Sequence, residues 1–173
     1  KPMFWLKSGL FAVGLGMSFV YAIIPPLARD LGLSEIQASF IFSLSAVAWA
    51  MTSAPWGRAS DKYGRRNIAI LGYIGYSISM IILILPIYLA DKNILSAAFV
   101  FPLLILGRTI YGLLGSATRP ASFAYIADIT PKSKRTKKFA RFESNFLLGT
   151  LVGPLLGCLL YTSDAADESE RVG

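Results

Sequence analysis

The sequence contains no histidine and a single cysteine, Cys158, among its 173 residues. These absences exclude a disulfide framework, histidine-based catalysis and a histidine-ligated metal site. Charge is also scarce, since 16% of the residues are charged against roughly 25% in ordinary soluble domains. Apolar residues make up 54% of the chain. This balance predicts an integral membrane protein.

The net charge of +7 does not indicate a nucleic-acid partner. The basic residues lie in short links between apolar segments and do not form one basic face. The bilayer therefore explains them better than a nucleic acid does.

Five apolar segments approach the roughly 20 residues that a helix needs to cross a bilayer. They predict an all-α membrane protein with spans at about 4–27, 36–56, 68–89, 95–127 and 139–157. Pro25-Pro26 is expected to end or kink the first span, and Ser34 to cap the second. The fourth segment is too long for one perpendicular crossing, so it tilts or extends into the cytoplasm.

The distribution of lysine and arginine sets the orientation. Two cations, Arg29 and Lys92, fall on one side of the predicted membrane. Twelve fall on the other side: Lys1, Lys7, Arg58, Lys62, Arg65, Arg66, Lys132, Lys134, Arg135, Lys137, Lys138 and Arg141. Positive charge favours the cytoplasmic side, which predicts a cytoplasmic N-terminus.

The first dense cluster of charge reads Gly57-Arg58-Ala59-Ser60-Asp61-Lys62-Tyr63-Gly64-Arg65-Arg66 and lies between the second and third segments. Its two glycines suit a tight turn, and its four cations suit the cytoplasmic side. Its pattern, Gly-x-x-x-Asp-Lys-x-Gly-Arg-Arg, resembles the loop between helices two and three of the major facilitator superfamily, and every position is matched. A generic positively charged loop is the alternative.

The resemblance covers about residues 4–157. It implies five helices of a six-helix half-bundle, within a transporter of twelve helices whose second half is a partner outside this chain. Such transporters bind a small molecule between their halves and work by alternating access.

Two arginines lie inside the fourth segment, where charge is costly and normally faces water or a partner. Arg108 and Arg119 are eleven residues apart, so in a continuous helix they share one face, about 16 Å apart along the axis. Tyr111 lies on the same stripe. They predict a cationic wall of a substrate or proton pathway; a structural pairing, or snorkelling of Arg119, is the alternative.

The segment Arg108-Thr109-Ile110-Tyr111-Gly112 resembles the fourth-helix motif of the same family, with tyrosine in place of the usual glutamine. By the same resemblance, Arg65 would contact Asp128, while Asp61 would face a helix of the second half. These contacts would form a cytoplasmic gate with Gly57, Gly64 and Arg66. The alternative is a plain surface ion pair worth roughly 0–1 kcal/mol.

Glycines recur at four-residue intervals in Gly149-Thr150-Leu151-Val152-Gly153-Pro154-Leu155-Leu156-Gly157 and so line one helix face suited to close packing. The run resembles the fifth-helix motif typical of proton-coupled exporters in the family, which favours export. Ordinary glycine-mediated packing is the alternative. Three roles are open for Glu143, near the start of this span: it exchanges a proton, pairs with Arg119, or lies in the headgroup layer without a specific role.

The sequence changes character after Gly157. The run Cys158–Glu168 resembles a translated sequencing-library adapter, and acidic residues cluster there. Residues 158–173 are therefore expected to be a non-native tail; a natural acidic loop is the alternative.

These observations predict a multi-pass transporter of the plasma membrane, in a bacterium the inner membrane, that exports a small organic molecule. We expect it to use the proton gradient and no cofactor. An uptake symporter for a sugar or a metabolic anion, or a non-transporting membrane sensor, remains an alternative. The sequence contains no nucleophile–base set, metal cluster or phosphate loop that would indicate an enzyme.

Overall fold

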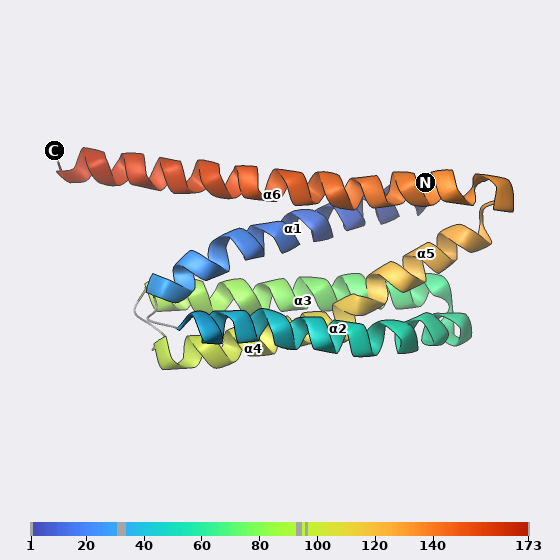
Figure 1. Cartoon of the computed structure of the whole chain (residues 1–173), viewed down its shortest axis with the longest axis horizontal. Coiled ribbons are helices and arrows are strands. Elements are labelled where there is room, and N and C mark those ends of the chain that lie inside the picture. The colour runs from blue at the N-terminus through green and yellow to red at the C-terminus, as the bar shows by residue number, and fades with distance from the viewer. Residues whose placement is uncertain (1, 31–33, 93–94, 96, 173) are drawn as a thin grey trace. The chain divides into compact units, whose positions relative to one another are not determined.

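The structure is a computed structural model that describes residues 2–30, 34–92, 95 and 97–172. Regular structure in these residues is helical throughout, as the all-α prediction requires. The helices, shown in Figure 1, are α1 (Pro2–Asp30), α2 (Glu35–Tyr63), α3 (Arg65–Asp91), α4 (Ala97–Leu114), η1 (Gly115–Ala117), α5 (Thr118–Asp128), η2 (Lys132–Lys134) and α6 (Arg135–Val172), with η1 and η2 being short 3₁₀ helices.

Four segments of the described chain are long and apolar enough to cross a membrane: Phe4–Pro26, Glu35–Tyr63, Arg65–Ala90 and Phe99–Asp128. They correspond to the first four predicted spans. The fifth predicted span, 139–157, is helical within α6, and its crossing of the membrane stays a prediction.

Several helices extend beyond their predicted ends. α1 continues through Pro25 and Pro26 to Asp30. α6 passes Cys158 without interruption and ends at Val172, so the non-native origin of residues 158–173 stays a prediction.

The start of α2 confirms the predicted cap at Ser34. The Gln37 backbone N–H donates to Ser34 Oγ at 3.2 Å, and the Ser34 N–H donates to Gln37 Oε1 at 2.9 Å. This reciprocal capping box satisfies two N–H groups that have no partner inside the helix.

The charged link between the second and third spans is mostly helical. α2 continues through Gly57 to Tyr63 and α3 starts at Arg65, so Gly64 alone separates them. The prediction of a loop from Gly57 to Arg66 is therefore wrong. Alanine, lysine and arginine favour helix, and the last turns of α2 can retain that form outside the membrane.

The fourth predicted span is interrupted. α4 ends at Leu114, three residues form η1, and α5 starts at Thr118. Figure 1 shows α5 leaving α4 in a new direction. Pro120 explains the break, because proline has no N–H to donate and its ring collides with the carbonyl four residues earlier unless it lies in a first turn.

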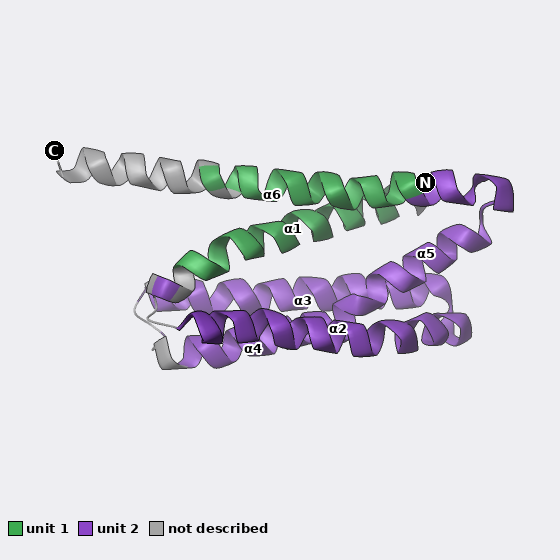
Figure 2. Ribbon diagram, viewed as in Figure 1, with its two compact units in different colours: residues 1–27, 140–173 green, residues 28–139 purple. Residues whose placement is uncertain are grey.

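The chain divides into two compact units, coloured separately in Figure 2. Unit 1 comprises Lys1–Leu27 and Ala140–Gly173, so it holds most of α1 and α6. Their backbones approach closely where glycines remove side chains. A Cβ added at Gly14 would meet the Phe146 carbonyl oxygen, and one at Gly149 would meet the Phe11 carbonyl oxygen.

Unit 2 comprises Ala28–Phe139 and holds α2, α3, α4 and α5. A buried cluster of Ile68, Ala69, Ala117 and Ala121 joins α3 to η1 and α5, and Trp56 and Ala59 of α2 pack against it. The small residues let three helices and the 3₁₀ turn meet at one point. This cluster lies beside the turn between α2 and α3 and so supports the candidate site.

Candidate gating and pathway site

Gly64 forms the turn between α2 and α3. Its φ of 95° with ψ of 131° lies where residues with a Cβ rarely occur. Its carbonyl accepts the N–H of Ile68 at 3.2 Å and so begins the hydrogen-bond pattern of α3. Gly57 has no such constraint: it lies within α2, and an added Cβ would approach only the Pro120 Cβ, at 4.0 Å. Of the two glycines expected to shape the turn, only Gly64 does so.

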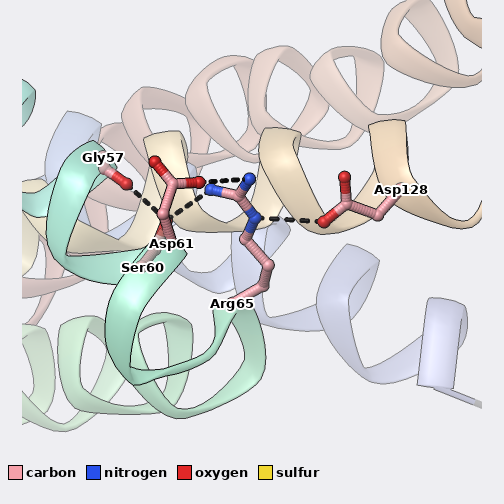
Figure 3. A network of polar contacts seen from close by, with 5 residues as sticks. All are labelled: Gly57, Ser60, Asp61, Arg65 and Asp128. Carbon is pink, nitrogen blue, oxygen red and sulfur yellow. Dashed lines mark hydrogen bonds and ion pairs between the residues drawn. The ribbon is translucent and has the colours of Figure 1, made fainter.

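The Arg65 guanidinium is the centre of the polar network in Figure 3. Its Nε donates to Asp128 Oδ2 at 3.0 Å, and one terminal nitrogen lies 2.5 Å from Asp61 Oδ1. The other terminal nitrogen donates to Ser60 Oγ at 2.9 Å, and this hydroxyl in turn donates to the Gly57 carbonyl at 2.7 Å. Each of the three guanidinium nitrogens of Arg65 therefore contacts an oxygen acceptor.

This network ties the α2–α3 turn to the C-terminal residue of α5. The contact between Arg65 and Asp128 that the family resemblance implied is present. Asp61, expected to face a missing helix, pairs with Arg65 in the same turn. The Asp61 and Asp128 side chains are 60% and 57% exposed, so water screens both pairs and each contributes little alone. Arg66, also expected in the gate, is exposed.

Arg108 is enclosed by aromatic rings. Its side chain is 1% exposed, and its guanidinium carbon lies 5.1 Å from the Phe42 ring centre and 5.3 Å from the Tyr111 ring centre. Tyr76 of α3 meets Tyr111 edge to face, with ring centres 6.0 Å apart. Cation–π contacts of this kind are worth about 2 kcal/mol or more when water is excluded.

The stripe expected through Arg108, Tyr111 and Arg119 does not form as a single helix face. The 3₁₀ turn of η1 separates the two arginines, and its three residues add about 60° to the rotation of a continuous α-helix. Arg108 is fully buried, whereas Arg119 is half-buried in the first turn of α5. Glu143 is half-buried in unit 1, so its pairing with Arg119 stays a prediction.

The glycine run of α6 packs against α1. A Cβ added at Gly153 would overlap Ser18 Oγ and lie 2.8 Å from the Leu15 carbonyl oxygen. Pro154 is exposed on the same helix, and α6 continues through it. The surroundings of Gly157 lie outside the described residues. The predicted close-packing face is therefore seen at Gly149 and Gly153, and its role in export stays a prediction.

Sequence reasoning missed three residues of these sites. Ser60 immediately precedes Asp61 within the matched pattern, so its position in the sequence could have indicated that it lies near Arg65. Phe42 and Tyr76 had none, because they come from other helices and only the folded arrangement brings them to Arg108 and Tyr111.

Comparison with known proteins decides which family has this arrangement. The family model of the Major Facilitator Superfamily matches residues 8–164. The chain belongs to this superfamily. The match confirms the family predicted from the charged turn, and it covers both the Arg65 network and Arg108.

Two bacterial relatives of this superfamily member are drug-resistance proteins. The class B tetracycline resistance protein of Escherichia coli is 34% identical over 151 residues, which is 86% of this chain and 34% of that protein. The quinolone resistance protein NorA of Staphylococcus aureus is 26% identical over 157 residues, which is 91% of this chain and 37% of that protein. The chain thus spans about a third of the length of these relatives.

Proposed function

We propose that this chain is part of a proton-coupled exporter of a small organic molecule. The observation that carries the proposal is the similarity, over most of the chain, to two proteins named for resistance to tetracycline and to quinolones. The close α1–α6 packing at Gly149 and Gly153 supports it, because that run resembles the fifth-helix motif of exporters.

In this proposal the Arg65 network is part of a cytoplasmic gate. It holds the α2–α3 turn to the end of α5, and a few such pairs bias a two-state equilibrium between inward-open and outward-open forms. Asp61 would exchange its partner Arg65 for a helix of the second half. Because each pair is exposed, the gate opens at low energetic cost.

Arg108 would supply the buried positive charge of the pathway. Enclosed between Phe42 and Tyr111, it attracts an anionic group or a carboxylate that gains and loses a proton. Arg119 and Glu143 would extend this pathway. The proton gradient supplies the energy, without a bound cofactor, and the partners are the bilayer, the substrate and the second half of the transporter.

The proposed location is the plasma membrane, in a bacterium the inner membrane, with a cytoplasmic N-terminus. The two predicted cytoplasmic clusters of cations support this orientation. We propose no enzymatic role.

The test is drug flux in proteoliposomes containing the full-length transporter, with tetracycline and a quinolone as probes. Arg108→Ala should abolish flux, while Arg29→Ala, an exposed change at the end of α1, should not. Arg108→Lys keeps the charge but not the planar stacking and should be intermediate. Unchanged flux in Arg108→Ala would remove Arg108 from the pathway, and drug binding without flux in the parent protein would favour a sensor.

A further inference from the structure

The break between α4 and α5 leaves backbone carbonyls that need partners. The last four carbonyls of an α-helix have no intrahelical donor, and in α4 these include those of Gly112 and Leu113. Within a membrane-spanning segment an unsatisfied carbonyl is costly because no bulk water replaces the missing bond. Yet this break is enclosed: Ser116 and Ala117 are 0% exposed and Thr118 is 2% exposed.

Two side chains of α2 supply the missing donors. Thr52 Oγ1 donates to the Gly112 carbonyl at 2.9 Å and lies 2.8 Å from Ser116 Oγ. Trp56 Nε1 donates to the Leu113 carbonyl at 2.6 Å. Thr52 and Trp56 are four residues apart, so they lie on one face of α2, one turn apart. Together they contact two consecutive carbonyls at the start of the break.

Glycines allow this close approach from two sides. On α4, a Cβ added at Gly112 would lie 2.6 Å from the Ser45 carbonyl oxygen and 2.7 Å from the Ala48 Cβ, so only glycine lets α2 lie this near. On α3, a Cβ added at Gly72 would lie 2.5 Å from the Thr118 nitrogen. The break is thus held between α2 and α3.

We propose that Thr52 and Trp56 are positioning residues that set the direction in which α5 leaves α4. This inference rests on the proposed transport function, because α5 carries Arg119 in its first turn and Asp128 at its end. A change in the direction of α5 moves both the predicted pathway arginine and the Arg65 contact. The α2 residues act on the pathway and the gate through α5, without contact with substrate.

The hydroxyl pair has a second arrangement available. Thr52 Oγ1 also lies 2.7 Å from the Ala48 carbonyl of its own helix, and Ser116 Oγ lies 3.1 Å from the Leu113 carbonyl of its own helix. If α2 and the break separate, each hydroxyl therefore keeps a partner. The Thr52–Ser116 contact can open during a transport cycle and leave neither hydroxyl unsatisfied.

The test distinguishes the hydrogen bonding of the Thr52 hydroxyl from the packing of the Thr52 side chain. Thr52→Val keeps the shape and removes the hydroxyl, whereas Thr52→Ser keeps the hydroxyl and removes a methyl group. Thr109→Val is the matched control, because the Thr109 hydroxyl donates to the Ile105 carbonyl within α4 at 2.8 Å. Trp56→Phe tests the second contact and keeps an aromatic ring in the buried cluster.

The direction of α5 is measured by the rate of thiol labelling at two buried positions. Ala121→Cys reports on α5, and Val100→Cys reports on α4 away from the break; both parent residues are 0% exposed. The background is the full-length transporter without other cysteines. Loss of a hydrogen bond to a carbonyl at the break should raise labelling at position 121 about tenfold in Thr52→Val and Trp56→Phe. Position 100 should change less than twofold, and Thr52→Ser and Thr109→Val should match the parent.

Equal increases at positions 100 and 121 would show general loosening and overturn the proposal. Faster labelling at position 121 in Thr52→Ser, with parental labelling in Thr52→Val, would also overturn it. The methyl group of Thr52, and not its hydroxyl, would then hold α5 in place. Drug flux is measured on the same samples. If labelling follows the predicted pattern while the parent moves no drug, the positioning role stands and the transport function fails.

Discussion

The contact between Arg65 and Asp128 gives the sharpest quantitative prediction for the gate. Asp128→Asn keeps the shape of the side chain and one acceptor oxygen but removes the negative charge opposite Arg65 Nε. The Arg65 and Asp128 side chains are 26% and 57% exposed. We therefore expect the free energy of unfolding to fall by about 0.5–1 kcal/mol, the upper part of the range for screened pairs. One kcal/mol changes a two-state ratio about fivefold.

A double-mutant cycle isolates the interaction free energy between Arg65 and Asp128. The free energy of unfolding in detergent micelles is measured for Arg65→Gln, for Asp128→Asn and for the double variant, and the coupling between them should be about 0.5–1 kcal/mol. At 1 M salt, where the Debye length is about 3 Å, the coupling should largely disappear. The control cycle combines Arg66→Gln with Asp128→Asn and should show no coupling free energy. Arg66 is exposed and forms no ion pair within the described part of the chain.

A coupling below the error of the measurement, or one that survives at 1 M salt, would refute the reasoning. The first result would show that the pair does not contribute to the gate. The second would show that the interaction is not the screened electrostatic contact that its exposure implies.

The remaining predictions concern glycines. Gly64→Ala should destabilise the protein by about 1–3 kcal/mol because of its positive φ. Gly57→Ala should be neutral or stabilising by up to about 1 kcal/mol, because its Cβ would meet only the Pro120 Cβ, at 4.0 Å. Thermal unfolding compares the two, and equal losses would contradict the assignment of the turn to Gly64. Gly153→Ala should lower the free energy of unfolding by about 1–3 kcal/mol, because the added Cβ forces α1 and α6 apart. Adding Ser18→Gly to this variant should recover only part of the loss, because the Leu15 carbonyl still blocks the Cβ. Full recovery would show that only the serine side chain limits the packing.

Local sequence signals predicted the parts of the fold that depend on neighbouring residues. The residue type and position of Ser34 were sufficient to predict the cap of α2, whereas the return contact from Gln37 was not predicted. The contact of Arg65 with Asp128 followed from a pattern that resembles the family's.

Apart from the Arg65–Asp128 contact, which the family resemblance implied, the tertiary contacts of the candidate sites were not predicted. Pro120 was a visible reason for a break in the fourth span, but apolar length alone does not show that α2 and α3 would enclose it. The enclosure of Arg108 depends on Phe42 of α2, which is distant in sequence. A buried arginine in a span therefore indicated that a partner exists, but not which one.

The proposed function is export of a small molecule in exchange for protons. The most direct measurement records substrate and proton movement together in proteoliposomes that contain the full-length transporter, under an imposed pH gradient. The account predicts that substrate moves against its own gradient and opposite to protons, and that a protonophore abolishes this movement. Substrate moving in the same direction as protons, or binding without any flux, would contradict it.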